Sequence, residues 1–315
     1  MKGSTKIVFM GTPDFAVPSL RALIEGGVDL LLVVTQPNRP RGRGRTSVPT
    51  PVKVLAEENG IEVVQPERVS DPVFLGRMRA LSPDLVVVAA FGQFLPKELL
   101  NIPPMGCVNV HASILPKYRG AAPANWAILM GEKVTGVTTI LLDEGMDTGD
   151  MLLVNETAIG GEETAGELIE RLAGIGAEVL METISGLEDG TITPVPQDHE
   201  KKTLAPLLKK EDGRIDWGRT PGEIKNHVRG MIPWPGAFTT LRGENLKVFR
   251  VDVMDKKGGG GAGKVADIVD KGIVVAAKGG VVVIRELQAP GKRRMGAEEF
   301  LRGKGIEIGT TLGGE

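Results

Sequence analysis

The sequence predicts an α/β fold in two parts: a doubly wound, mostly parallel sheet of the nucleotide-fold type, followed by a smaller OB-like β-barrel domain. The length of 315 residues is more than one hydrophobic core usually organises. Over the first half of the chain, short apolar runs alternate with amphipathic stretches, as strands and crossover helices do in a parallel sheet. Toward the end, short apolar runs alternate with glycine-rich turns, which favours a small barrel.

The first part is expected to contain strands joined by helices. The apolar runs that predict strands are Ile7–Met10, Leu30–Thr35, Ile61–Val64, Leu85–Ala90 and Cys107–Val110. Amphipathic stretches at Phe15–Glu25 and Val52–Glu58 predict helices. Between the first strand and helix we expect Thr12 to cap the helix and Pro13 to take its first position. This turn lacks the G-x-G-x-x-G spacing, so a dinucleotide phosphate is not indicated.

The second part of the chain is predicted to be a separate domain. An amphipathic segment at 161–188 is expected to form one long helix that closes a first domain of residues 1–189. Residues 190–209, rich in proline and lysine, suit a linker over the surface, and residues 210–315 form the second domain. Its strands are predicted at Phe238–Leu241, Lys247–Val253, Gly272–Ala276 and Val281–Leu287. OB-like barrels often bind nucleic acid, which is an inference from fold analogy alone.

The composition is that of a globular protein without a membrane segment. Apolar residues make up 41% and charged residues 25% of the chain, and no apolar run reaches the roughly 18 residues that span a bilayer. A strand-like segment begins at Lys6, which leaves no room for a leader peptide. We therefore expect a cytoplasmic protein.

The few cysteines and histidines argue against a metal site. The single cysteine, Cys107, excludes an internal disulfide and a cysteine cage, and it fits a reducing compartment. Its apolar neighbours favour a packing role, with a reactive thiol as the alternative. His199 and His227 stand alone, so no metal is expected.

The net charge of −2 hides an asymmetry along the chain. Residues 1–199 carry 16 Lys/Arg and 25 Asp/Glu, a net charge of −9, whereas residues 200–315 carry 22 and 15, a net charge of +7. Clustered cations release counterions from phosphates, so a polyanionic partner of the second domain is one interpretation. An ordinary solvated lysine surface is the other.

Three polar residues of the first domain form a candidate catalytic set. Asn109 and His111 lie two apart at the end of a predicted strand, so they face the same way at the sheet edge where parallel sheets bind ligands. Asp147 lies in a glycine-containing segment, 143–150, whose tight loop would bring the carboxylate back over the strand ends. Each residue alone is more often structural. Together, an amide donor, an imidazole and a carboxylate suit acyl transfer.

The surroundings of these residues resemble a known family. The run N-V-H-A-S-I-L-P-K-Y-R-G from Asn109 to Gly120, with G-M-D-T-G around Asp147, resembles the signature of formyltransferases that use 10-formyltetrahydrofolate. The resemblance implies that Asn109, His111 and Asp147 are the catalytic residues. The S-L-L-P turn by which the family contacts folate corresponds here to Ser113, Ile114, Leu115 and Pro116.

The family has branches that formylate a purine-precursor amine, a nucleotide sugar, or the methionine on initiator tRNA. The segments that resemble the tRNA branch are Gly11–Ala16, Thr35–Arg45, Pro51–Lys53, Gly120–Pro123, Arg214–Trp217, Pro233–Pro235 and Gln288–Lys292. The resemblance therefore implies a monomer that binds initiator methionyl-tRNA and a reduced folate, with 10-formyltetrahydrofolate as formyl donor and no metal. The same chemistry on a small-molecule amine, and a noncatalytic RNA-binding protein, are the competing hypotheses.

A basic segment after the second predicted strand is the candidate tRNA contact in the first domain. Arg39, Arg41, Arg43 and Arg45 are interleaved with proline and glycine, which favours a mobile loop over a helix. Arginines bind phosphates through planar donor forks and stack on bases. We predict that the loop binds the acceptor stem, and the resemblance favours Arg43. The alternative is a solvated surface loop.

Formyl transfer gives each member of the catalytic set an expected task. The Asn109 amide and the His111 imidazole would donate hydrogen bonds to the oxygen on which charge develops. Asp147 would orient His111 and favour its protonated form. The sequence leaves open which nitrogen of His111 faces the substrate.

Overall fold

The computed structural model describes residues 4–41, 46–256, 260–269, 271–303 and 306–314. These residues pack as two compact units. The first unit comprises the described residues of Met1–Pro123, Val134–Ala158 and Ile169–Pro206. The second comprises those of Ala124–Lys133, Ile159–Leu168 and Leu207–Glu315.

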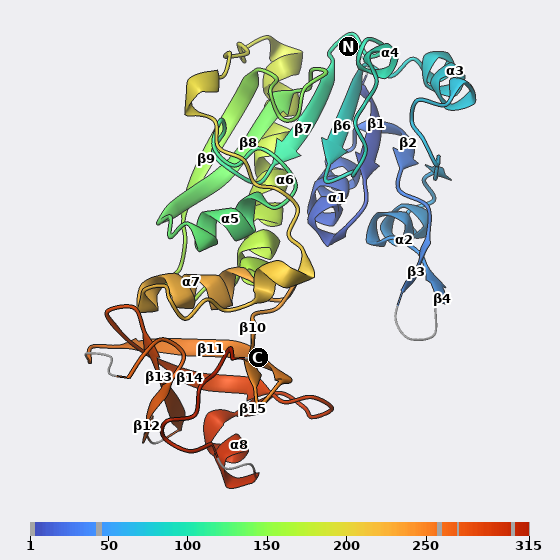
Figure 1. Cartoon of the computed structure of the whole chain (residues 1–315). Coiled ribbons are helices and arrows are strands. Elements are labelled where there is room, and N and C mark those ends of the chain that lie inside the picture. The colour runs from blue at the N-terminus through green and yellow to red at the C-terminus, as the bar shows by residue number, and fades with distance from the viewer. Residues whose placement is uncertain (1–3, 42–45, 257–259, 270, 304–305, 315) are drawn as a thin grey trace. The chain divides into compact units, whose positions relative to one another are not determined.

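A seven-stranded sheet organises the first unit, in the order β5-β2-β1-β6-β7-β8-β9 (Figure 1). The strands are β1 (Lys6–Gly11), β2 (Asp29–Val34), β5 (Val63–Val64), β6 (Leu85–Ala89), β7 (Cys107–His111), β8 (Val134–Leu141) and β9 (Met151–Ala158). The strands from β5 to β7 pair in parallel, and β8 and β9 join in antiparallel fashion. The predicted doubly wound, mostly parallel sheet is therefore confirmed.

Helices cover both faces of this sheet. They are η1 (Asp14–Ala16), α1 (Val17–Glu25), α2 (Pro51–Glu58), α3 (Pro72–Leu81), α4 (Lys97–Leu100) and α6 (Ala165–Asp189). The side chains of α3 and α4 share one apolar cluster with Cys107 of β7. On the other face, Gly176 of α6 lies so close to Val110 that an added Cβ would be 2.8 Å from its methyl group. Among the described helices, none is long and apolar enough to cross a membrane.

Cys107 lies within the core, as its apolar neighbours predict. The side chain is 1% exposed, between strand neighbours and the α3–α4 cluster. Burial raises the pKa of the Cys107 thiol to about 12. The reactive thiolate is therefore suppressed, and the packing role holds.

Thr12 does not cap a helix, so that prediction was wrong. Pro13 takes the N-cap of η1, without a side-chain cap bond. The Thr12 hydroxyl instead donates to the Phe91 carbonyl at 3.1 Å and accepts from the Gln36 amide at 3.4 Å. These contacts join the loops that follow β1, β2 and β6, and no local pattern in the sequence indicates such a distant partner.

The segment after α6 is packed into the first unit through Pro206. Val195 exchanges two backbone hydrogen bonds of 2.8 Å with Met151, and Ala205 is fully buried. The Ala205 amide donates to the Arg119 carbonyl at 2.7 Å. This part of the expected surface linker therefore differs from the expectation, because its backbone is paired with the body of the unit.

The second unit is built on an antiparallel sheet of six strands, ordered β10-β11-β14-β13-β12 with β15 beside β14. These are β10 (Phe238–Leu241), β11 (Glu244–Met254), β12 (Val265–Val269), β13 (Gly272–Ala277), β14 (Gly280–Gln288) and β15 (Met295–Gly296). The register between β11 and β14 shifts on either side of Arg250, as at a β-bulge. The prediction of a second, smaller β domain is confirmed, and its strands pair in antiparallel fashion. Its helices are α5 (Pro123–Leu129), α7 (Pro221–Gly230) and α8 (Ala297–Gly303), and η3 spans Lys210–Gly213.

The histidine of α7 makes the second unit sensitive to acid. Burial lowers the pKa of His227 more than its hydrogen bond to the Gly213 backbone raises it. Its Nε2 atom is buried and has no hydrogen-bond partner among the described residues. The unfolded chain therefore binds a proton at a higher pH than the folded unit does, and stability is lost as pH falls from about 6.5 through the lower folded value.

We predict that His227→Gln reduces this loss of stability between pH 7.5 and 5.5. Trp126, Trp217 and Trp234 all belong to the second unit, so tryptophan fluorescence during urea unfolding reports on it. The change in unfolding free energy between the two pH values should be smaller in His227→Gln than in the wild type. His199→Gln, at an exposed histidine of the first unit, is the control and should keep the wild-type change. Equal changes in all three proteins would contradict the assignment.

Candidate active site

Asn109 and His111 lie on β7, in the interior of the sheet. Asn109 pairs with Val88 of β6 on one side and with Ile140 of β8 on the other. His111 is 5% exposed, whereas Asn109 is only partly buried. No described residue hydrogen-bonds to the side-chain amide of Asn109. Asn109 and His111 therefore lie on the same face of the strand, and the Asn109 amide is available to a ligand.

The two nitrogens of His111 have different partners. Nε2 lies 3.0 Å from the Tyr118 carbonyl oxygen, and Nδ1 lies 3.6 Å from Oδ2 of Asp147. A carbonyl oxygen only accepts, so Nε2 carries a hydrogen and donates it to Tyr118. Nδ1 is therefore the nitrogen that can exchange a proton, and it faces Asp147 at a distance longer than a hydrogen bond.

The loop between β8 and β9 carries Asp147 back over the face of β7. Leu141, the last residue of β8, pairs with Val108 near the start of β7. The loop therefore begins beside the amino end of β7 and returns Asp147 to His111 at the carboxyl end. The fold brings together the three residues that the sequence singled out.

A hydrogen bond from the backbone fixes the carboxylate of Asp147. The backbone N–H of Gly120 donates to Oδ2 at 2.8 Å. Asp147 has φ +52°, in the left-handed region, and its side chain is 15% exposed. Within the same loop, Asp143 accepts from the Gly145 amide at 3.0 Å and from the Thr148 hydroxyl at 2.6 Å. The loop that carries Asp147 is thus held by hydrogen bonds between its own residues.

The turn Ser113–Pro116 lies directly after His111 and is rigidly held. The Ser113 hydroxyl donates to the Lys117 carbonyl at 2.6 Å. Thr138 of β8 donates to the Ser113 carbonyl at 2.7 Å and accepts from the Leu115 amide at 3.2 Å. Ser113 and Leu115 are buried, whereas Ile114 and Pro116 are partly exposed. A ligand would therefore meet Ile114, Pro116 and the backbone rather than the Ser113 hydroxyl.

The basic segment is partly a hairpin rather than an irregular loop. The strands β3 (Arg39–Arg41) and β4 (Thr46–Val48) pair in antiparallel fashion, with Arg39 opposite Val48. Arg39 is exposed. Arg43 and Arg45 lie outside the described residues. Arg39 and Arg41 are themselves paired with β4, which their proline and glycine neighbours did not indicate.

Several residues of the site were not predicted from the sequence. Tyr118 and Gly120 lie inside the quoted motif, yet only the structure shows that their backbones hold His111 and Asp147. Gln197 donates through Nε2 to the carbonyls of Asp147 and Gly149 at 2.9 and 2.7 Å. It lies in the expected linker, where no motif marked it. Backbone contacts leave no signal in residue type, whereas the motif could have directed attention to Gly120.

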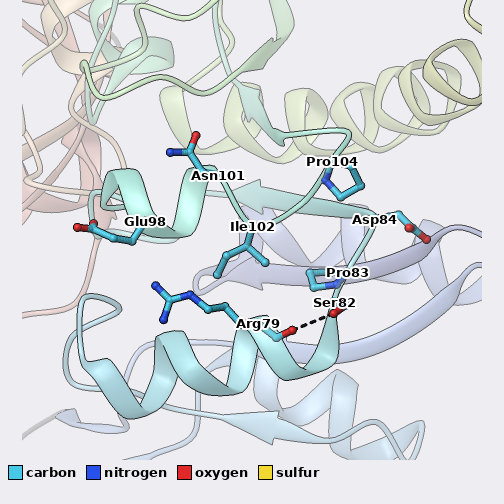
Figure 2. Close-up of a pocket in the computed structure, with 8 residues that line it drawn as sticks. All are labelled: Arg79, Ser82, Pro83, Asp84, Glu98, Asn101, Ile102 and Pro104. Carbon is cyan, nitrogen blue, oxygen red and sulfur yellow. Dashed lines mark hydrogen bonds between the residues drawn. The ribbon is translucent and has the colours of Figure 1, made fainter.

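A cavity of about 630 Å³ opens at the other end of the sheet (Figure 2). Its lining residues are Arg79, Ser82, Pro83, Asp84, Glu98, Asn101, Ile102 and Pro104. These residues precede β6 and β7, so the cavity lies at the amino ends of these strands, whereas His111 ends β7. In Figure 2 the one bond drawn joins Ser82 to the Arg79 carbonyl, at 2.8 Å. The cavity is thus separate from the candidate active site.

Comparison with known proteins identifies relatives along the whole chain. Residues 5–184 match the family described as formyl transferase, and residues 207–305 match the formyl transferase C-terminal domain. A methionyl-tRNA formyltransferase of Geobacter metallireducens is 52% identical over 310 residues, which cover 98% of each chain. That of Clostridioides difficile is 48% identical over 308 residues, which cover 98% of this chain and 100% of the relative.

A solved structure shares the fold at lower sequence identity. The N-formyltransferase of Helicobacter canadensis, solved with folinic acid and dTDP-3-aminofucose, superposes with a TM-score of 0.69 at 19% identity. The match covers 90% of this chain and 99% of that one.

Gly120 generates a prediction, because only glycine fits where its amide holds Asp147. Its φ is +121°, and an added Cβ would lie 2.7 Å from the Ala205 carbonyl oxygen. We expect Gly120→Ala to lower the free energy of unfolding by about 1–3 kcal/mol in urea titrations, since the backbone must shift. Gly27→Ala is the control, because Gly27 has φ +68° but nothing within 4 Å of the added Cβ. A loss no greater than that of the control would refute the steric argument.

Proposed function

The chain belongs to the formyl transferase family, and we propose that it transfers the formyl group of 10-formyltetrahydrofolate to the free amino group of methionyl initiator tRNA, for translation initiation. The observation that carries this proposal is the similarity to curated methionyl-tRNA formyltransferases at about half identity along 98% of the chain. The geometry of Asn109, His111 and Asp147 supports it, because the three polar groups converge on one face at the end of β7.

Asn109 and His111 are the proposed donors to the formyl oxygen. The folate supplies an activated formyl group, and the amine nitrogen bonds to the formyl carbon as the bond from that carbon to the folate nitrogen breaks. The uncommitted amide of Asn109 supports its role, since a preorganised donor costs little reorganisation as charge develops on the oxygen. Nδ1 of His111 becomes the second donor once it has accepted the proton of the attacking amine, because Nε2 is already bound to Tyr118.

The proton balance of the reaction uses the same nitrogen. The attacking amine loses a proton and the departing folate nitrogen gains one. Nδ1 of His111 accepts the first and delivers the second, so the enzyme ends as it began. The Asp147 carboxylate lies 3.6 Å from Nδ1 and orients the ring through this exchange. A reduced folate is held by the turn of Ser113, Ile114, Leu115 and Pro116, whose exposed atoms are largely apolar side chain and backbone.

The tRNA is bound by the basic segment and by the C-terminal part. Arg39, Arg41, Arg43 and Arg45 contact the phosphates of the acceptor stem. Residues 1–189 act as the catalytic domain, 190–209 as the connection, and 210–315 as the OB-like tRNA-binding domain. The protein acts as a monomer in the cytoplasm. The match of residues 207–305 to the formyl transferase C-terminal domain supports a separate second domain.

An acceptor assay tests the proposal. The protein is incubated with 10-formyltetrahydrofolate and, separately, methionyl initiator tRNA, uncharged initiator tRNA, free methionine or a dTDP-amino sugar, and products are identified by mass spectrometry. We expect a formyl group only on the charged tRNA. Formylation of the free amino acid or the amino sugar instead would assign the same chemistry to a small-molecule amine. No formyl transfer to any acceptor would reject both assignments.

One prediction of the proposed function concerns the two residues assigned to the formyl oxygen. His111→Ala and Asn109→Ala should each lower turnover by about 100- to 1000-fold, because the first removes the group that carries the proton and the second removes a preorganised donor. Affinity for tRNA, measured by filter binding, and the thermal unfolding midpoint serve as controls and should stay near the wild-type values. Near-normal turnover in His111→Ala would reject the catalytic assignment.

Another prediction of the proposed function concerns the arginines of the basic segment. Arg39→Ala and Arg43→Ala should weaken tRNA binding and should each reduce the slope of log affinity against log salt by about one, because each removes one phosphate contact. Arg79→Ala removes an exposed arginine at the opposite end of the sheet and should keep the wild-type slope. An unchanged slope in Arg39→Ala and Arg43→Ala would show that these side chains are solvated and do not bind phosphate.

A further inference from the structure

Two buried polar side chains lie behind the Asp147 loop and have no task in the proposed chemistry. Gln197 is 5% exposed and Arg119 is 3% exposed. Gln197 comes from the segment after α6, outside any helix or strand, and Arg119 follows the residue whose carbonyl holds His111. Buried polar groups are costly unless paired, so their partners indicate what they do.

Gln197 uses the full hydrogen-bonding capacity of its amide. Nε2 donates to the carbonyl oxygens of Asp147 at 2.9 Å and Gly149 at 2.7 Å. Oε1 accepts from Nε and Nη2 of Arg119, at 3.1 and 2.5 Å. Carbonyls only accept and guanidinium only donates, so the amide has one possible orientation. The side chain is a fixed link between Arg119 and the Asp147 loop.

Asp147 needs this support, because its backbone is in a costly conformation. A residue other than glycine is uncommon at φ +52°, so its surroundings must hold it there. Gln197 grips the chain at Asp147 itself and two residues later. The same bonds therefore fix the direction in which the Asp147 side chain leaves the backbone, and with it the approach of Oδ2 to His111.

Arg119 connects Gln197 to the residues that hold His111 and Asp147. Besides Gln197, its Nη2 donates to Nδ1 of His199 at 3.0 Å. Its chain neighbours complete the arrangement: the Tyr118 carbonyl accepts from His111, and the Gly120 amide donates to Asp147. One tripeptide thus holds the imidazole, the carboxylate and, through Gln197, the backbone that carries the carboxylate.

We propose that Gln197 is a positioning residue of the formyl-transfer site, which sets the Asp147 carboxylate against Nδ1 of His111 and is itself held by Arg119. It acts through the backbone of Asp147 and touches neither substrate. The proposal rests on the proposed function, since it gives Gln197 no effect other than through Asp147.

Gln197→Glu tests this role with little change in shape. The carboxylate keeps its partner Arg119, and it gains attraction from the guanidinium. It loses both N–H donors, however, and places an oxygen against the carbonyls of Asp147 and Gly149. Asn59→Asp is the matched control: it makes the same amide-to-carboxylate change in the first unit, where Nδ2 of Asn59 donates to the Leu55 carbonyl at 2.8 Å at the end of α2.

The measurement is steady-state formylation of methionyl initiator tRNA by the full chain. We expect Gln197→Glu to lower kcat by about 10- to 100-fold, because small misplacement of a catalytic group has large effects. KM for the folate and for the tRNA should stay within about threefold, because Gln197 contacts neither. Asn59→Asp should keep the wild-type kcat. A merely structural role would lower the unfolding midpoint and leave kcat unchanged well below it.

A double-mutant cycle with Asp147→Ala separates positioning from an independent effect. If Gln197 acts only through Asp147, then adding Gln197→Glu to Asp147→Ala should lower kcat by less than about twofold further. Equal losses of kcat in both backgrounds, or an unchanged kcat in Gln197→Glu alone, would overturn the proposal. Two other results concern the proposed function instead of Gln197. If the wild type transfers no formyl group, the proposed function fails. If Asp147→Ala keeps the wild-type kcat, the proposed role of Asp147 in that function fails.

A second variant keeps the test decisive if Gln197→Glu does not fold. Gln197→Asn retains the amide but is one methylene shorter, so it cannot reach Arg119 and both carbonyls together. The same cycle and the same KM comparison apply. A wild-type kcat in this variant would also reject the role.

Discussion

An imidazole has two nitrogens, and in this chain the backbone takes one of them. The bond from Nε2 of His111 to the Tyr118 carbonyl, at 3.0 Å, fixes the tautomer of the neutral ring and leaves Nδ1 as the only nitrogen that exchanges protons. The direction of Nδ1 determines which groups of the site can act together with it. The carboxylate that faces Nδ1 comes from a different segment, the loop after β8, and the Asn109 amide lies on the same face of β7 as His111.

The antiparallel end of the sheet meets this requirement. Because β8 runs back along β7, the loop after Leu141 begins beside the amino end of β7 and extends toward His111 with Asp147. If β9 ran parallel to β8, the two strands would need a crossover connection of a dozen or more residues in place of this short loop. The antiparallel pairing of β8 with β9 therefore leaves Asp147 on a short loop, whose carboxylate lies beside the imidazole that ends β7. The tripeptide 118–120 then fixes the distance between them.

Local patterns predicted the parts of the fold that depend on local physics. Apolar runs located the strands on both sides of Asn109, and their alternation with helices predicted the parallel sheet. The pairing of Asp147 with His111 came from glycines in its loop and from family resemblance, not from spacing. The roles of Gly120 and Gln197 could not be predicted, because a backbone amide and a glutamine in a proline-rich segment gain meaning only from distant partners. Thr12 failed for the same reason: a tertiary contact displaced the local cap.

Packing also changes how the charge asymmetry should be interpreted. Segments 124–133 and 159–168 pack in the second unit, although the sequence places them before the predicted linker. Counted by unit, the first carries 17 Lys/Arg and 22 Asp/Glu, a net charge of −5, and the second carries 21 and 18, a net charge of +3. This contrast is weaker than the −9 and +7 of the linear division, since the acidic residues around Glu163 move to the basic side. Net charge alone therefore cannot hold a polyanion on the second unit. Attraction of tRNA must depend on local clusters of cations, such as the arginines of 39–45 in the first unit and Lys292, Arg293 and Arg294 in the second.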